Sequence, residues 1–182
     1  MDGKSQAILL ERSACDFQAA TFCAWLKWRG GELPQPLFHF GAGPEQFLTV
    51  MLDAKGRLAI QARKSGEDYA IVAPERFPSN RWTHIAAAMD GANATLLIDG
   101  RLVAQGAFPV KPEDFLASAA DRAPDHDYFG RDRAGRFFNG WADEIRVYSE
   151  ALTPARVEAE AGRVAGYEED SSTRGDNPEG CT

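Results

Sequence analysis

The chain has 182 residues, a formal net charge of −7 and a 44% share of hydrophobic residues, which fits one globular domain with its own core. The acidic balance argues against sequence-independent nucleic-acid binding, which needs a basic footprint, and against adhesion to anionic lipid. No apolar run reaches the ~20 residues that a membrane helix needs. We therefore expect neither a nucleic-acid partner nor membrane insertion.

Short strands separated by turns are predicted for most of the first hundred residues. Leu58, Ile60 and Ala62 recur at every second position, so one face of their strand is apolar. Asp99-Gly100 is the strongest hairpin signal in the chain. The predicted strands lie at 7–10, 21–28, 37–40, 47–52, 57–63, 69–72, 81–89, 93–98 and 101–105.

The strand pattern breaks at residues 109–127, which hold three prolines and several alanines. We expect a long surface connection there, with one helical turn near 113–116. Strands are predicted again at 128–130 and 141–148. Many short strands with regular turns indicate an all-β sandwich or barrel.

One helix is predicted near the C-terminal end. Thr153 is a good N-cap, Pro154 suits the first helical position, and Gly166 can end the helix. The acidic segment 167–182 is rich in Ser, Gly and Pro, and we expect it to be disordered. The predicted domain therefore covers residues 1–166.

The three cysteines allow at most one disulfide. Cys15 and Cys23 either form a bridge or stay reduced, in which case Cys23 is a small buried strand residue. Their spacing matches no common zinc motif.

Four blocks in a fixed order carry a resemblance to a known family. An aromatic residue, a Trp and a Lys alternate in 21–27, and 82–86 reads Trp-x-His-Ile-Ala. An Asp-Gly hairpin at 97–103 and a closing strand at 138–148 follow. From residue 21 to 157 the chain resembles laminin-G-like and concanavalin A-like lectin/glucanase domains.

The resemblance implies an all-β jelly-roll sandwich of two antiparallel sheets with one short C-terminal helix. It also implies an extracytoplasmic location, although the first residues lack the apolar core of a signal peptide. The fold hosts lectins, adhesion modules, pentraxin-like proteins and polysaccharide-cleaving enzymes, so it does not fix an activity.

Asp143 is the first candidate site residue. In an unbroken strand it shares a face with Ile145 and Val147, which places its carboxylate toward the core. A buried carboxylate needs either a cation or several hydrogen-bond donors, and an arginine partner is the alternative to a metal. The resemblance implies a structural calcium bound by Asp143 and the Gly41 carbonyl, with Glu11 as a further ligand.

The loop from residue 131 to 138 is rich in arginine and aromatic residues. Arg131, Arg133 and Phe137 are candidate ligand contacts, because such groups stack on sugar rings and clamp carboxylates. The alternative is a plain hairpin turn at Gly135 with solvated arginines and a buried Phe138.

Trp28 is a further candidate for ligand binding. Trp25 and Trp28 lie an odd number of positions apart, so they face opposite sides of a strand. If Trp25 is buried, Trp28 is an exposed stacking platform. The alternative is that Trp28 packs beneath the loop at 34–36.

No catalytic constellation stands out in the sequence. His39, His84 and His126 are scattered, and the Glu-x-Asp-x-x-Glu strand of retaining glucanases of this fold is absent. We therefore expect a non-catalytic module that recognises a glycan or a protein surface. A structural or accessory domain of a larger assembly is the alternative, and a polysaccharide hydrolase or lyase is the least favoured hypothesis.

Overall fold

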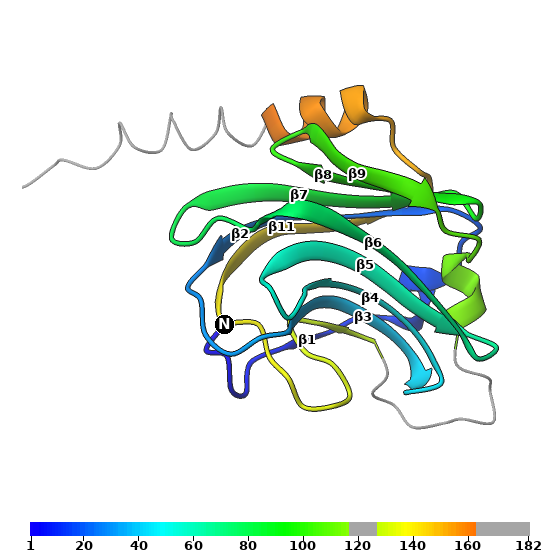
Figure 1. The fold of residues 1–182 in the computed structure, drawn as a ribbon, viewed down its shortest axis with the longest axis horizontal. Coiled ribbons are helices and arrows are strands. Elements are labelled where there is room, and N and C mark those ends of the chain that lie inside the picture. The colour runs from blue at the N-terminus through cyan, green and yellow to red at the C-terminus, as the bar shows by residue number, and fades with distance from the viewer. Residues whose placement is uncertain (117–126, 163–182) are drawn as a thin grey trace, which may run out of the picture.

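The computed structural model describes residues 1–116 and 127–162, which form a sandwich of two antiparallel sheets (Figure 1). The first sheet has the order β1 (Ile8–Leu9), β10 (Tyr128–Phe129), β3 (Gln35–Gly43), β4 (Gln46–Leu52), β5 (Arg57–Lys64) and β6 (Glu67–Arg76). The second has the order β11 (Gly140–Tyr148), β2 (Ala20–Trp28), β7 (Trp82–Met89), β8 (Asn93–Ile98) and β9 (Arg101–Ala107). The predicted all-β, two-sheet architecture is confirmed.

All the predicted strands are present, and β3 and β6 are longer than expected. Between β5 and β6, Ser65 and Gly66 both have positive φ, of 54° and 83°. Positive φ at both central residues is typical of a two-residue hairpin turn. The two strands therefore pair up to this turn. Its residues are Ser-Gly rather than the Asn-Gly or Asp-Gly that most strongly predicts a hairpin, so the sequence did not indicate it.

The helical segments are short. The described residues contain two 3₁₀ helices, η1 (Arg12–Cys15) and η2 (Pro112–Phe115), and η2 confirms the predicted helical turn. The C-terminal helix starts at residue 154, where the Thr153 hydroxyl accepts a hydrogen bond from the Arg156 backbone N–H at 3.4 Å. The expected end of this helix, the acidic tail and most of the 109–127 connection lie outside the described residues. Within the part described, no helix is long and apolar enough to cross a membrane.

The core between the sheets is dominated by phenylalanine. Phe22 of β2 packs against Phe38 and Phe40 of β3, with ring centroids 5.4 and 5.1 Å apart, and Phe129 lies 5.0 Å from Phe38. All four side chains are fully buried. Burial of each such side chain contributes about 1.5–3 kcal/mol, so this aromatic cluster fixes how the two sheets pack.

The outer faces of the two sheets are covered differently. A second hydrophobic cluster joins the five-stranded sheet to the C-terminal helix, which lies above β8 and β9 in Figure 1. On the six-stranded sheet, the strongly curved strands carry instead the loop between β10 and β11, drawn in yellow beneath β3 and β4. This second outer face carries the candidate site.

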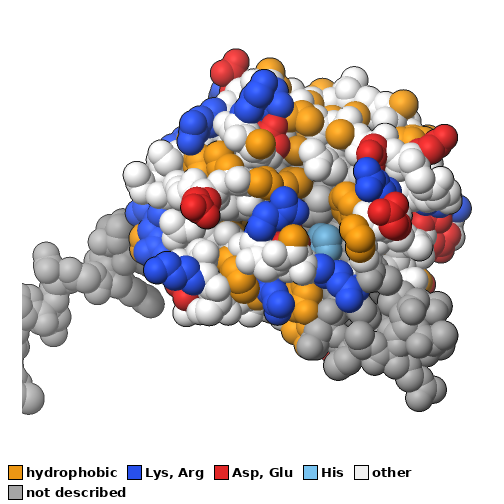
Figure 2. All heavy atoms as spheres, turned by 60° about the horizontal axis from the view of Figure 1, so that its bottom comes forward, with side chains coloured by type: hydrophobic (Ala, Val, Ile, Leu, Met, Phe, Trp, Pro, Cys, Tyr) orange, Lys and Arg blue, Asp and Glu red, His pale blue; other side chains and the backbone are white. Residues whose placement is uncertain are grey.

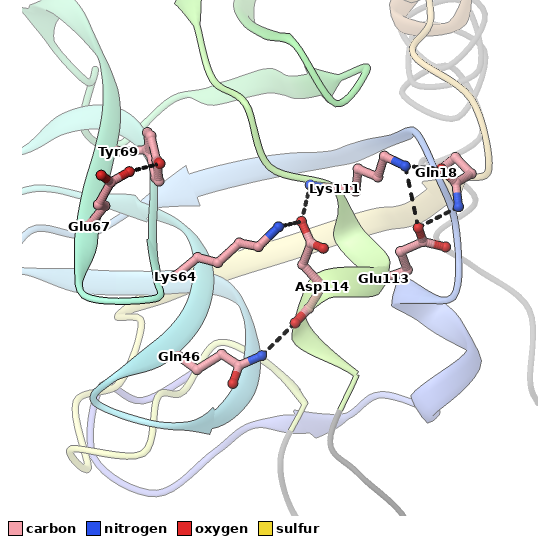
Figure 3. A network of polar contacts seen from close by, with 8 residues as sticks. All are labelled: Gln18, Gln46, Lys64, Glu67, Tyr69, Lys111, Glu113 and Asp114. Carbon is pink, nitrogen blue, oxygen red and sulfur yellow. Dashed lines mark hydrogen bonds and ion pairs between the residues drawn. The ribbon is translucent and has the colours of Figure 1, made fainter.

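A polar network ties η2 to the six-stranded sheet (Figure 3). The Asp114 carboxylate lies 2.7 Å from the Lys64 ammonium and accepts the Lys111 backbone N–H at 2.8 Å. The Gln46 side chain donates to the Asp114 carbonyl at 2.6 Å. These contacts join η2 to β4 and β5 at the end of the sheet.

Candidate functional site

A hollow lies on the outer face of the six-stranded sheet. Side chains on β3, β4 and β5 alternate between core and exterior, and the strand register pairs His39 with Thr49 and Thr49 with Gln61. These three outward side chains form one row across the sheet. The loop between β10 and β11 lies against the row and encloses a hollow of about 660 Å³. We call it the central hollow; His39, Thr49, Met51, Gln61, Arg63 and Arg133 are among the residues that line it.

His39 is the most unusual residue of the central hollow. Its side chain is 7% exposed, and neither ring nitrogen has a hydrogen-bond partner among the described residues. Burial lowers its pKa to about 4, so the imidazole is neutral at physiological pH. It stacks on Phe47 with ring centroids 6.1 Å apart. Both nitrogens are shielded from solvent, so a ligand pairs with them only when the side chains that cover them shift. Such pairing would relieve the cost of the unpaired nitrogens, about 1–3 kcal/mol each.

The two carboxylates that line the central hollow are both held by arginine. Asp132 accepts from the Arg136 side chain at 2.5 Å and from its backbone N–H at 3.0 Å. Asp53 accepts two hydrogen bonds from the Arg57 side chain, at 2.9 and 2.7 Å. Burial acts to raise the pKa of Asp53, but these hydrogen bonds outweigh it, so the pKa lies below its ordinary value. The carboxylate of Asp53 is therefore ionised at neutral pH.

Basic side chains surround the central hollow. Figure 2 shows this face, with lysine and arginine in blue around a partly covered histidine and hydrophobic side chains between them. The Arg63 guanidinium contacts the Asp68 carboxylate at 2.7 and 2.8 Å. Arg133 is exposed and lines the same hollow.

Of the three loop residues predicted as ligand contacts, only Arg133 lines the central hollow. The Arg131 guanidinium packs over the rings of Tyr128 and Phe137, at 5.0 and 5.6 Å. Phe137 is half-buried and lines a neighbouring hollow. The alternative hairpin geometry is present as well, with a φ of 77° at Gly135.

The expectation of an exposed platform at Trp28 is wrong. Trp28 is 1% exposed and donates its indole N–H to the Gln35 side chain at 3.1 Å. The opposite orientation of Trp25 and Trp28 is confirmed, but Trp28 shares the inward face of β2 with Phe22. The exposed tryptophan is Trp141 on β11, at 47%.

The inward orientation predicted for Asp143 is also wrong. The pairing of β11 with β2 shifts between Asp143 and Arg146, and Glu144 has a left-handed φ of 49°. This β-bulge inserts a residue, so Ile145 and Val147 pack on the core while Asp143 is exposed. The parity argument fails because it assumed an unbroken strand.

The three residues expected to bind calcium do not meet. The Gly41 N–H donates to the Asp127 carboxylate at 3.3 Å, and the Leu10 N–H donates to the Asp127 carbonyl at 2.8 Å. Gly41 and the segment that leads to Glu11 thus share one corner of the six-stranded sheet. Asp143 lies on the outer face of the other sheet, so the set does not fit one calcium ion.

Gly41 has a structural role that explains its identity. Its φ is 113°, and a Cβ atom there would lie 2.4 Å from the Gln46 carbonyl oxygen. Only glycine fits this approach of two strands. Among residues 1–116 and 127–162, no three His, Cys, Asp or Glu side chains form a cluster able to hold a metal.

The remaining candidates lie away from the central hollow. Cys15 and Cys23 are both buried, and no disulfide joins them. His84 lies on the outer face of the five-stranded sheet, where its ring meets that of Trp25 at 5.5 Å. Burial lowers the pKa of His84 to about 4 as well. His126 lies outside the described residues.

A family model described as the concanavalin A-like lectin/glucanases superfamily matches residues 2–158. The chain belongs to this superfamily. The resemblance inferred from four sequence blocks is thereby confirmed. No curated protein matches the chain.

Several solved structures share this concanavalin A-like fold. The CBM40 module of Ruminococcus gnavus IT-sialidase, bound to α2,3-sialyllactose, aligns with a TM-score of 0.68 at 17% identity over 87% of this chain and 97% of that one. Domain 4 of AbnA, an arabinanase from Geobacillus stearothermophilus, in complex with arabinotriose, gives 0.67 at 22% identity over 88% and 79%. A SAP-like pentraxin from Limulus polyphemus gives 0.57 at 14% over 80% and 70%. At these identities the likeness establishes the fold.

Proposed function

We propose that this concanavalin A-like domain is a non-catalytic recognition module that binds a glycan in the central hollow. The observation that carries the proposal is the buried, unpaired imidazole of His39 in the floor of that hollow. A neutral imidazole has one donor and one acceptor nitrogen, and a sugar hydroxyl both donates and accepts. The match makes a saccharide a suitable ligand for this floor.

The surroundings of His39 support the same class of ligand. Phe47 and Met51 supply apolar surface against which the C–H face of a sugar ring can pack. Gln61 and the exposed Arg133 offer polar groups at the edge of that surface. Two structural neighbours of this fold were solved with a saccharide bound, which supports the proposal by analogy.

The state of the carboxylates favours recognition over hydrolysis. A glycosidase of the usual type needs one carboxyl group with a raised pKa as acid and a second as base or nucleophile. In the central hollow, Asp53 has a lowered pKa and is held by Arg57, and Asp132 is held by Arg136. Such carboxylates suit structural roles, so we expect no turnover of a labelled polysaccharide panel.

The accessory-domain hypothesis is compatible with glycan binding. The arabinanase neighbour is one domain of a larger enzyme, and a module of this kind can hold a catalytic partner near its polysaccharide. A protein ligand remains the alternative occupant. Pull-down with a polysaccharide fraction and with a protein fraction separates the two, because only the first is competed by free oligosaccharide.

Binding of a structural calcium stays a prediction, and it is no longer placed at Asp143. If a calcium ion binds only the folded state, added calcium raises the melting temperature and a chelator lowers it. Because Asp143 is exposed, we expect Asp143→Asn to leave any such response unchanged. Equal melting temperatures with calcium and with chelator would end the calcium hypothesis.

The central proposal is tested by a matched pair of histidine variants. On a glycan array followed by calorimetry, we expect the wild-type domain to bind at least one glycan. His39→Phe keeps the ring stack on Phe47 but removes both nitrogens, and we expect about tenfold weaker binding or worse.

His84→Phe is the control, because His84 is equally buried with a lowered pKa but lies on the other sheet. It should bind as wild type does. Equal losses in the two variants, or no binding to any glycan by the wild-type domain, would contradict the proposal.

A further inference from the structure

We propose that the ligand is a linear oligosaccharide whose further, neutral sugar units occupy a second hollow beside the central one. This inference rests on the proposed function. The second hollow has a volume of about 600 Å³ and lies between the N-terminal segment, the loop after β2 and the loop before β11. We call it the N-terminal hollow; its lining includes Lys4, Gly31, Glu32, Gln35 and Asn139.

The two hollows are adjacent. Pro34 and Arg136 line both of them, so these two side chains form their shared boundary. The Arg136 side chain is held at this boundary by Asp132, whose own side chain is 3% exposed. A chain molecule that leaves the central hollow across this boundary would reach the N-terminal hollow.

The floor of the N-terminal hollow is fixed before any ligand arrives. Gln35 is 2% exposed, and its side-chain oxygen accepts from the Trp28 indole N–H at 3.1 Å and from the Asn139 backbone N–H at 3.0 Å. Its side-chain nitrogen donates to the carbonyls of Gly30 and Glu32, at 3.1 and 2.9 Å. A saturated, buried floor of this kind loses little conformational freedom on binding.

Glycine keeps the N-terminal hollow open. A Cβ atom at Gly31, where φ is 111°, would lie 3.2 Å from the Gln35 side-chain nitrogen and 3.3 Å from that of Asn139. Any side chain at Gly31 would thus intrude on the floor. At Gly135 the space around a Cβ atom is empty to 4 Å. A ligand can therefore approach backbone and floor closely.

The rim identifies neutral sugars as the better occupants. Lys4 and Glu32 are exposed at the rim, and Arg136 stands at the boundary, so charges of both signs surround the hollow. The Asp2 carboxylate accepts the backbone N–H groups of Lys4, Ser5 and Gln6, at 2.9, 2.9 and 3.1 Å, and so fixes the turn that carries Lys4. A rim with both signs of charge does not favour an anionic or a cationic ligand. Its charged side chains can still donate hydrogen bonds to the hydroxyl groups of a neutral sugar chain or accept hydrogen bonds from them.

The test is a chain-length series measured by calorimetry. The probes are the best-binding array oligosaccharide and its shortened forms, with arabinose, arabinobiose and arabinotriose as the first series. For the wild-type domain we expect an affinity gain of about tenfold from monosaccharide to trisaccharide. Lys4→Ala combined with Glu32→Ala should abolish that gain and leave monosaccharide affinity unchanged.

The control variant combines Arg101→Ala with Glu158→Ala, which removes one charge of each sign at exposed positions outside both hollows. It should keep the full gain, and thermal unfolding should show both double variants folded. Equal affinity for all chain lengths would contradict binding in the N-terminal hollow while the proposed function stands. The same holds if the Lys4→Ala, Glu32→Ala variant keeps the same affinity gain as the control variant. A wild-type domain that binds no array glycan contradicts the proposed function itself.

Discussion

His39 and His84 are two buried, neutral histidines on opposite outer faces of the sandwich. Burial lowers the pKa of each from 6.5 to about 4. The unfolded chain therefore binds more protons than the folded chain between these pH values, so stability is complete above about pH 6.5 and falls as the pH drops toward 4. Below pH 6.5 each imidazole is protonated more readily in the unfolded chain, where water solvates the charge, and this difference lowers the free energy of unfolding.

The first prediction at the residue scale concerns this pH dependence. Between pH 7.5 and pH 5, each histidine should lower the free energy of unfolding by about 2 kcal/mol. Urea unfolding of wild type, His39→Phe and His84→Phe at both pH values measures the effect. Each variant should lose about half of the histidine-dependent decrease, and a decrease unchanged in both variants would show that other groups cause it.

At the scale of the element, the bulge in β11 decides which side chains reach solvent. It turns Asp143 outward and keeps Ile145 and Val147 on the core. Glu144 takes the left-handed conformation that this requires, with a φ of 49°. Residues other than glycine and asparagine adopt this region at a cost.

A second prediction follows for Glu144. Glu144→Val should destabilise the domain by about 1–2 kcal/mol, because a β-branched residue fits the left-handed region poorly. Glu144→Gly relieves the strain and should change stability by less than about 1 kcal/mol, since it also loses the contact with Arg146. Chemical unfolding of the two variants provides the comparison, and equal stability of both would argue against a strained bulge.

The bulge also marks the part of the strand where side-chain orientation could not be predicted from the sequence. Alternation identified the strands and their core faces wherever pairing is regular, as at Leu58 and Ile60, and Asp99-Gly100 marked its hairpin. A bulge leaves no clear signal in an isolated strand, because it depends on the register with β2. The orientation of Asp143, and with it the proposed calcium set, could therefore not be derived from periodicity.

At the scale of the whole molecule, the superfamily was predictable and the central hollow was not. The four blocks that identify the family lie in strands that build the sandwich. Each block is a run of consecutive residues, and the order of the blocks can be read directly along the chain. The central hollow joins β3, β4 and β5 to a loop about seventy residues later, which only the fold brings together. The one sequence signal was the polar His39 between two core phenylalanines, Phe38 and Phe40.

The loop residues illustrate the same limit. Arg133 and Arg131 were both predicted as ligand contacts from the composition of one loop, but only Arg133 lines the central hollow, and Arg131 packs over two aromatic rings. For Trp28 the sequence left an exposed and a buried position open, because parity relates it to Trp25 but does not say which of the two is buried; the structure has the buried one. Side-chain burial is a property of both sheets together.

The most direct test of the account is a nuclear magnetic resonance titration of the labelled domain with its best-binding glycan. We predict that the perturbed backbone and imidazole signals cluster at His39, Thr49 and Gln61, on the outer face of the six-stranded sheet. Perturbations confined instead to the opposite face, around the exposed Trp141, would contradict the account.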